Sequence, residues 1–288
     1  MIYYFLPGNG IFGGVKVGYQ LVDVLNSFGV SACIASPGGL AAQWFPSQAP
    51  VINRDDLLAG WKSSDIALFS LPSDYQELRS TCERLIFHCQ GTDPAIESFE
   101  SDYDMVTLSC WKQATDYFRD RGIQPVEVRL GISDTFFYSG QLKRANSISF
   151  MPRRGRELFE SLAHGLDGWS VSPIDGLGES GVARQLTRST HFVATSPGEW
   201  FGLPALEAMA AGCVVLSPEV LGGTEYLRHG ETALVGDWPD LREYLTHKRP
   251  SGREEAELAQ RGMAMAHVYS MSNHKKSVRK AVDEGVFS

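Results

Sequence analysis

The sequence predicts an α/β protein built from two doubly wound domains with parallel sheets. Short apolar runs alternate with stretches of helical spacing along most of the chain, a pattern typical of parallel strands connected by helices. The clearest example lies at residues 191–216, where apolar runs at 191–194 and 213–216 flank a loop and a short helical stretch. The 288 residues are enough for two domains that each bury their own core.

The first domain begins with a strand at residues 2–6, a glycine-rich turn, a helix that Gly29 caps and a second strand at residues 30–35. The turn contains Gly-x-Gly-x-x-Gly at Gly8, Gly10 and Gly13, a pattern of dinucleotide-binding folds. The second strand ends without the acid that would hold a ribose, which weakens the interpretation of an NAD site. Two interpretations remain open: a turn that serves the fold, or a loop that contacts a ligand.

Further strands are expected at residues 66–71, 85–89, 105–109 and 126–130, with helical stretches between them that include residues 111–121. The pattern fades after Gly131, and we expect a linker that ends the first domain at residue 140. The second domain shows strands near residues 148–151, 169–172, 191–194, 213–216 and 233–235, and helices near residues 156–164, 181–189, 204–211, 239–246 and 254–269. For a last basic helix at residues 272–282 we expect a solvated face, with peripheral membrane contact as the alternative.

The composition indicates a globular, cytoplasmic protein. Apolar residues make up 43% and charged residues 21% of the sequence, unlike a disordered chain. The formal net charge of −8 argues against broad binding of nucleic acid. The five cysteines form no Cys-x-x-Cys pair, which favours reduced thiols over disulfides. The sequence has no basic leader segment and no run of about 18 apolar residues, so we expect neither a signal peptide nor a membrane span.

The loop and helix at residues 195–212 predict a site for an anionic ligand that also has hydroxyl groups. Pro204 suits the first helical position and Gly212 the position after the helix. A helix start at the carboxyl edge of a parallel sheet binds phosphate. Glu199 and Glu207 flank this start, and carboxylates repel phosphate but accept hydrogen bonds from hydroxyls. A nucleotide sugar has both kinds of group.

Residues 199–212, Glu-Trp-Phe-Gly-Leu-Pro-Ala-Leu-Glu-Ala-Met-Ala-Ala-Gly, resemble the E-x-F-G-L-P-x-x-E-A-M-A-x-G signature of GT-B glycosyltransferases of the GT4 type. Three further segments are similar to that family in the same order: the Gly-Gly-Val turn at residues 13–15, the linker at residues 130–137, and the G-G-x-x-E segment with its continuation at residues 222–233. Residues 86–94 resemble, more weakly, a segment of bacterial rhamnosyltransferase-like members.

The resemblance implies the GT-B fold, with two Rossmann-like domains that face each other across a cleft. It assigns the acceptor to residues 1–140, the nucleotide-sugar donor to residues 141–271, and to residues 272–288 a helix that crosses back to the first domain. It also implies transfer with retention at the anomeric carbon, no obligatory metal or other cofactor, and a carbohydrate or other hydroxyl acceptor. We expect a cytoplasmic location, with peripheral contact at the inner membrane face as the alternative.

The resemblance also implies roles for single residues. Arg153 would stabilise the leaving phosphate, with Arg154 or Arg156 in place of the family's lysine, which is absent here. Glu199 would contact the donor sugar, and Glu207 would accept hydrogen bonds from the ribose. We assign no general base, since the departing phosphate takes the acceptor's proton. The other candidates are the donor-binding Phe201, Gly202, Leu203, Gly13 and Gly14, a catalytic donor contact at His88, and Gln90 and Asp93 on the acceptor side.

Other functions remain open at this point. A nucleotide-sugar isomerase or phosphorylase would share the architecture, and the missing lysine suggests an inactive relative that binds a nucleotide sugar or a partner. NAD-linked chemistry at the first glycine turn is a further alternative. Asp102-Tyr103-Asp104 has the metal-holding D-x-D pattern of GT-A enzymes, but it precedes a strand in a different type of domain, and we expect surface acids there.

Overall fold

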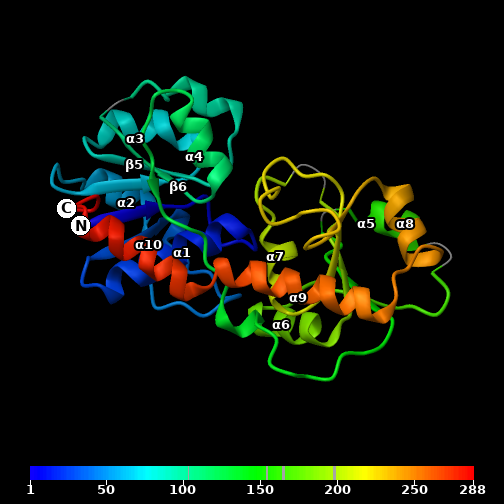
Figure 1. Ribbon diagram of the computed structural model, residues 1–288. Helices are drawn as coiled ribbons and strands as arrows, with labels where there is room; N and C mark the ends of the chain where they lie inside the picture. The colour runs from blue at the N-terminus through cyan, green and yellow to red at the C-terminus, as the bar shows by residue number, and fades with distance from the viewer. Residues whose placement is uncertain (103, 154, 164–165, 197–198) are drawn as a thin grey trace. The chain divides into compact units, whose positions relative to one another are not determined.

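The computed structural model describes residues 1–288 except 103, 154, 164–165 and 197–198 (Figure 1). The chain forms two compact units: unit 1 contains Met1–Gly131 and Met271–Ser288, and unit 2 contains Ile132–Ser270. Each unit has its own parallel sheet, which confirms the predicted α/β class. Among the described residues, no helix is both long and apolar enough to cross a lipid bilayer.

Unit 1 is built on a seven-stranded parallel sheet with the order β3-β2-β1-β4-β5-β6-β7. The strand order reverses between β1 and β4, as in doubly wound folds. The strands are β1 (Ile2–Phe5), β2 (Ala32–Ser36), β3 (Val51–Asn53), β4 (Ile66–Phe69), β5 (Leu85–Cys89), β6 (Val106–Ser109) and β7 (Val126–Glu127). The helices are α1 (Gly13–Ser27), α2 (Arg54–Ala59), α3 (Tyr75–Thr81), α4 (Lys112–Arg119) and α10 (Met271–Asp283), with short 3-10 turns η1 (Pro37–Gly39), η2 (Pro72–Asp74) and η3 (Pro94–Ser98).

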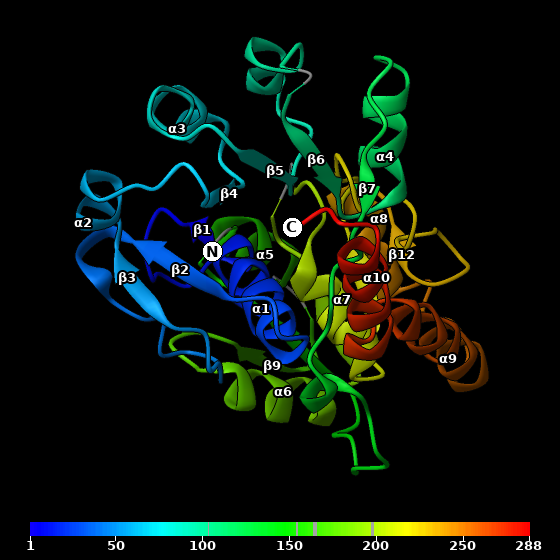
Figure 2. The same ribbon diagram turned by 90° about the vertical axis from the view of Figure 1, so that its left-hand side faces the viewer.

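Helices cover both faces of this sheet. On one face α1 and α10 lie side by side (Figure 2) and pack on a core that includes Tyr4 and Leu68. Successive strand residues point to opposite faces of a sheet, so the neighbours of Tyr4 and Leu68 along their strands lie on the other face. That face carries an aromatic cluster. Within it, the ring centroid of Phe87 lies 5.3 Å from that of Phe69 and 5.1 Å from that of Phe99.

Unit 2 is built on a five-stranded parallel sheet with the order β12-β11-β10-β8-β9. The strands are β8 (Ser147–Phe150), β9 (Ser170–Pro173), β10 (His191–Val193), β11 (Val214–Ser217) and β12 (Leu234–Val235). The helices are α5 (Arg156–Ala163), α6 (Glu179–Arg188), α7 (Leu203–Ala210), α8 (Trp238–Thr246) and α9 (Gly252–Val268), with a 3-10 turn η4 (Asp134–Phe136). Its core joins Ile148 and Phe150 of β8 to Phe159 of α5 and Leu241 of α8. α9 runs along α7 (Figure 1).

The chain passes between the two units at Gly131–Ile132 and at Ser270–Met271. The first domain was expected to end at residue 140, whereas residues 132–140 belong to unit 2. Phe136 is buried there, and the Tyr138 N–H donates to the Ala210 carbonyl oxygen at 2.9 Å. One hydrogen bond within unit 2 joins the two passages: the Ile132 N–H, just after the first passage, donates to the Tyr269 carbonyl oxygen, just before the second, at 2.7 Å.

Candidate functional site

Two loops at the carboxyl ends of neighbouring strands are packed against each other in unit 2. β8 and β10 pair in parallel, so the turn after β8 and the loop after β10 leave the same edge of the sheet. We call them the cationic turn (described residues 151–153 and 155–156) and the acidic loop (described residues 194–196 and 199–202). The Thr195 hydroxyl donates to the Met151 carbonyl oxygen at 3.1 Å. A β-carbon on Gly155 would lie only 2.1 Å from the Thr195 carbonyl oxygen, so the turn and the loop are in close contact.

The cationic turn presents arginines at this edge. Arg153 is exposed in the turn, and Arg156 is exposed at the first position of α5. Nη1 of Arg156 lies 3.7 Å from the carboxylate of Glu160, one helical turn further on, a surface ion pair that contributes little energy. Arg154 lies outside the described residues, so the identity of the second cation stays a prediction.

The acidic loop is held through its carbonyl groups. The Glu199 carbonyl oxygen accepts a hydrogen bond from the Leu221 N–H at 3.1 Å. The hydroxyl of the fully buried Tyr226 lies 2.6 Å from the Phe201 carbonyl oxygen and 2.7 Å from that of Gly202. These contacts fix the backbone around the N–H groups that were predicted to bind the ligand.

Glycine is required where residues 218–226, the glycine segment, pass the acidic loop. A β-carbon on Gly222 would lie 1.5 Å from the Trp200 carbonyl oxygen, and one on Gly223 would lie 2.7 Å from the Phe201 carbonyl oxygen. Both distances are too short for any side chain, so these two glycines allow the segment to support the acidic loop.

α7 begins directly after the acidic loop. Gly202, with φ of 80°, is its N-cap, and Pro204 lies in the first turn, one position later than predicted. At the other end Gly212 has φ of 71°, and its N–H donates to the Met209 carbonyl oxygen at 2.9 Å. The Cys213 N–H donates to the carbonyl oxygen of Ala208 at 3.0 Å, which completes a Schellman cap. The predicted glycine stop is therefore confirmed.

Lys143 supports two helix ends and was not among the predicted residues. Its ammonium donates to the carbonyl oxygen of Ser189, after α6, and to that of Ala211, after α7, each at 2.7 Å. Burial lowers the pKa of Lys143. Its side chain therefore supplies donors to carbonyl groups that a helix end leaves without intrahelical partners.

Negative charge gathers around Tyr226. Burial is the largest cause that raises the pKa of the Tyr226 hydroxyl well above its usual value, and the carboxylates of Glu199, Glu225 and Glu207 raise this pKa further. Glu207 is 7% exposed on α7. Glu225 accepts a hydrogen bond from the Tyr269 hydroxyl; its position directly after Gly222-Gly223-Thr224 was the signal that could have identified it. The carboxylates of Glu199, Glu207 and Glu225 thus all act on the Tyr226 hydroxyl.

In unit 1, the structure brings two of the predicted residues into contact. Gly13 and Gly14 begin α1, and Gln90 follows β5. The Gln90 side-chain amide donates to the Gly14 carbonyl oxygen at 3.4 Å and to the Tyr4 hydroxyl at 2.8 Å. A β-carbon on Gly14 would lie 2.5 Å from Oε1 of Gln90, so the glycine allows this approach.

His88 lies inside unit 1 rather than on its surface. It is 1% exposed, with Nδ1 at 2.9 Å from the Tyr4 hydroxyl and Nε2 at 2.9 Å from Sγ of Cys110. Burial, followed by the charge of His274, lowers its pKa to about 3, so the ring is neutral near pH 7. Both ring nitrogens have partners within unit 1, which argues against the predicted direct contact of His88 with a donor sugar.

Two acids in unit 1 have structural partners. Asp93 is exposed and caps the 3-10 turn η3, because its carboxylate accepts from the Ala95 N–H at 2.8 Å. Asp102 is not the surface acid that was expected: its side chain is 8% exposed and lies 3.1 Å from Nε of Arg79. Asp104 is exposed at 89% of its side chain. Tyr103 lies outside the described residues.

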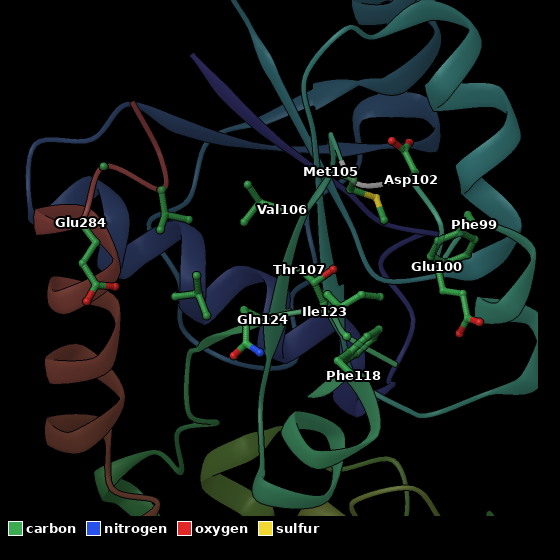
Figure 3. A pocket seen from close by; sticks show the side chains of 14 residues that line it. Phe99, Glu100, Asp102, Met105, Val106, Thr107, Phe118, Ile123, Gln124 and Glu284 are labelled. Carbon is green, nitrogen blue, oxygen red and sulfur yellow. The ribbon is translucent and has the colours of Figure 1, made fainter. Parts of the chain in front are cut away.

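A cavity of about 440 Å³ in unit 1 is lined by Asp102 and other residues that are not among the predicted site residues. It is found beside the start of β6, the opposite end of the strand from the carboxyl edge where doubly wound folds bind ligands. Figure 3 shows Glu284 on one side of this cavity and Phe99 and Glu100 on the other. Acidic side chains in its lining, which also include Asp102, disfavour an anionic nucleotide.

The comparisons with known proteins agree with this location of the site. Residues 152–247, which include the cationic turn except Met151, the acidic loop and the glycine segment, match the family model described as Glycosyl transferases group 1. None of the curated proteins matches the chain.

Several solved structures are similar over nearly the whole chain. Sucrose-phosphate synthase from Thermosynechococcus elongatus has a TM-score of 0.72 at 14% sequence identity, with 98% of each chain covered. Anabaena HepE in complex with UDP-glucose has a TM-score of 0.72 at 13% identity, with 98% of this chain and 99% of that chain covered. A glycosyltransferase from Rickettsia africae has a TM-score of 0.69 at 13% identity, with 99% and 97% covered. These similarities confirm the predicted GT-B fold, and the match of residues 152–247 to the family model supports a glycosyltransferase.

Proposed function

We propose that the protein transfers a sugar from a nucleotide diphosphate sugar to a hydroxyl group of an acceptor. The observation that carries this proposal is the contact between the cationic turn and the acidic loop, where Gly155 approaches Thr195 within the region that matches the glycosyltransferase model. A diphosphate is bound by cations and N–H groups, whereas sugar and ribose hydroxyls are bound by carboxylates. Unit 2 offers both kinds of group at one edge of its sheet.

Arg153 is assigned to the leaving diphosphate. When the bond between the anomeric carbon and the diphosphate oxygen breaks, negative charge grows on the phosphate and positive charge grows on the sugar ring. A cation whose interaction strengthens with this charge lowers the barrier rather than only binding the donor. The exposure of Arg153 in the cationic turn supports this role, and Arg154 or Arg156 is assigned as the second cation.

Glu199 is assigned to hydroxyls of the donor sugar and Glu207 to the ribose hydroxyls. The N–H groups of Phe201, Gly202 and Leu203 are assigned to the sugar or the diphosphate. The contacts of Tyr226 with the carbonyl oxygens of Phe201 and Gly202 support this assignment, because they hold that part of the backbone in a fixed orientation.

The transfer is proposed to be of the GT4 type, with retention and without an obligatory metal. The bond from the acceptor oxygen to the anomeric carbon forms on the face that the diphosphate leaves, and the acceptor's proton passes to the departing phosphate. The resemblance of residues 199–212 to the GT4 signature supports this step. The anomeric configuration of the first product, read by proton NMR, tests retention. Unchanged turnover after EDTA treatment is the result expected for a reaction without metal.

We assign the acceptor to unit 1, where Gln90 and Asp93 follow β5, and Gly14, assigned to the donor, accepts a hydrogen bond from Gln90. The resemblance of residues 86–94 to rhamnosyltransferase-like proteins is consistent with a glycan or lipid-linked acceptor, and a small molecule is the alternative. A cytoplasmic location, with contact to the inner membrane face as an open variant, completes the proposal.

A panel of UDP-, GDP-, ADP-, CMP- and dTDP-sugars in thermal unfolding tests the function. A ligand at about 100 times its Kd adds about 2.7 kcal/mol to the stability of the folded protein, so the correct donor raises Tm. If no nucleotide sugar raises Tm, the proposal is refuted. The absence of a lysine from the cationic turn favours one second candidate, an inactive relative, and binding of a donor without any turnover would support it.

A further inference from the structure

Tyr269 connects the candidate donor site to the passages of the chain between the two units. It is the C-cap of α9 and is 5% exposed. Its hydroxyl donates to the carboxylate of Glu225. The centroid of its ring lies 5.4 Å from that of Phe201 and 6.2 Å from that of Tyr226. Its carbonyl oxygen accepts the hydrogen bond from Ile132 at 2.7 Å. One residue therefore contacts the acidic loop, the glycine segment and the first passage.

The hydroxyl of Tyr269 is not needed for packing. A phenylalanine ring at this position would fill the same space against Phe201 and Tyr226. The oxygen is needed for the hydrogen bond to Glu225, whose carboxylate acts on the Tyr226 hydroxyl as those of Glu199 and Glu207 do. A hydroxyl that donates a hydrogen bond to one oxygen of a carboxylate fixes that oxygen and thereby sets the direction of the other oxygen.

The helix that carries Tyr269 is held firmly against α7. α9 packs along α7 (Figure 1). A β-carbon on Gly262 of α9 would lie 3.1 Å from the Thr232 carbonyl oxygen and 3.4 Å from Cγ of Met209, so the two helices approach closely. A displacement of the glycine segment or of α7 is therefore expected to reach the end of α9 and the hydrogen bond with Ile132.

We propose that Tyr269 is a positioning residue that orients Glu225 toward the donor and couples occupancy of the donor site to the Ile132–Tyr269 hydrogen bond. The proposal rests on the proposed function, since it requires a nucleotide ligand in unit 2. It adds Glu225 to the donor-binding residues and gives the ligand an effect at the place where the chain leaves the unit.

The test compares Tyr269→Phe with Tyr244→Phe. Tyr244 is a matched control because its hydroxyl lies 3.5 Å from a carboxylate of Glu255, in the same unit and on α8. Titrations with UDP, GDP, ADP, CMP and dTDP give the affinity of each variant. Hydrogen exchange of the peptide that contains Ile132 is measured with and without each nucleotide at saturation, together with exchange in the acidic loop.

For the wild type and Tyr244→Phe, the nucleotide that binds should slow exchange at Ile132 and in the acidic loop. Tyr269→Phe should bind this nucleotide about tenfold more weakly, the loss expected for one hydrogen bond to a charged group. At saturation it should protect the acidic loop but no longer Ile132. Glu225→Ala removes the same contact without changing α9 and should also lose the protection at Ile132, which keeps the test valid if Tyr269→Phe unfolds.

The outcomes separate the two claims. Suppose that a nucleotide binds the wild type. If either Tyr269→Phe or Glu225→Ala then keeps the affinity and the Ile132 protection of the Tyr244→Phe control, the coupling is refuted and the proposed function stands. If no nucleotide binds the wild type, the proposed function fails and the coupling fails with it.

Discussion

Replacing Gly155 by alanine should damage both catalysis and folding. The new β-carbon would lie 2.1 Å from the carbonyl oxygen of Thr195 and 2.9 Å from its carbonyl carbon. The cationic turn and the acidic loop must therefore separate by about 1 Å, a displacement that lowers the rate by about 100-fold, or about 2.7 kcal/mol, when it misplaces catalytic groups. Because Gly155 has φ of 96°, alanine also adds about 1–2 kcal/mol of backbone strain to the folded state.

Gly176→Ala separates strain from displacement. Gly176 lies in unit 2 with φ of 63°, and a β-carbon on it would meet nothing within 4 Å, so only the strain is added. Urea unfolding should show a loss of about 1–2 kcal/mol for Gly176→Ala and about 1–3 kcal/mol more for Gly155→Ala. Release of nucleoside diphosphate from the donor should fall about 100-fold in Gly155→Ala alone. Equal turnover by the two variants would refute the idea that the contact with Thr195 positions the site.

Four further predictions concern single side chains. Arg153→Ala should lower kcat by about 10–100-fold with a smaller change in donor KM, because the interaction of Arg153 strengthens as charge develops on the leaving phosphate. Steady-state kinetics of this variant and of Arg156→Ala measures kcat and KM. A change in KM alone would make Arg153 a binding residue. Glu207→Gln should raise donor KM about tenfold with little change in kcat, and an unchanged KM would remove the assigned ribose contact. Lys143→Met should lower the free energy of unfolding by about 1–3 kcal/mol in urea titrations, because two helix-end carbonyl groups lose their donor; unaltered stability would contradict this. His88 has a pKa of about 3 in the folded state, against 6.5 for an ordinary histidine. Between these pH values the unfolded chain binds more protons than the folded protein, so the free energy of unfolding should rise with pH across this window. In acid unfolding, His88→Gln should flatten this rise, and an equally steep rise in the variant would show that His88 does not cause it.

The sheets could be predicted where their strands are buried apolar runs. β5 occupies Leu85–Cys89, the five residues expected for it, and all of them are buried. β3 and α2 could not be identified in this way, because the three residues of β3 are only half-buried at the sheet edge. α2 depends on contacts from elsewhere in the chain: Nη1 of Arg54 lies 3.1 Å from the carboxylate of Asp74.

The candidate site was predictable only as far as it is continuous in sequence. Glu199 and Glu207 belong to one motif, and residues 151–156 follow directly from a predicted strand. The Gly155–Thr195 and Tyr269–Glu225 contacts join residues far apart in the sequence, and no local pattern indicates them. The position of His88 near a strand end suggested access to a ligand, but the pattern carries no information on which partners bury its ring.

The central claim is that unit 2 binds a nucleotide diphosphate sugar and breaks the bond between the sugar and the phosphate. The most direct measurement is the release of nucleoside diphosphate from each donor of the panel by the wild type and by Glu199→Ala. The wild type should release it slowly from at least one donor even without an acceptor. Glu199→Ala should still bind the nucleotide but release it about 100-fold more slowly, the loss expected when a group that stabilises the transition state is removed. No release from any donor, or the same rate in both proteins, would contradict the account.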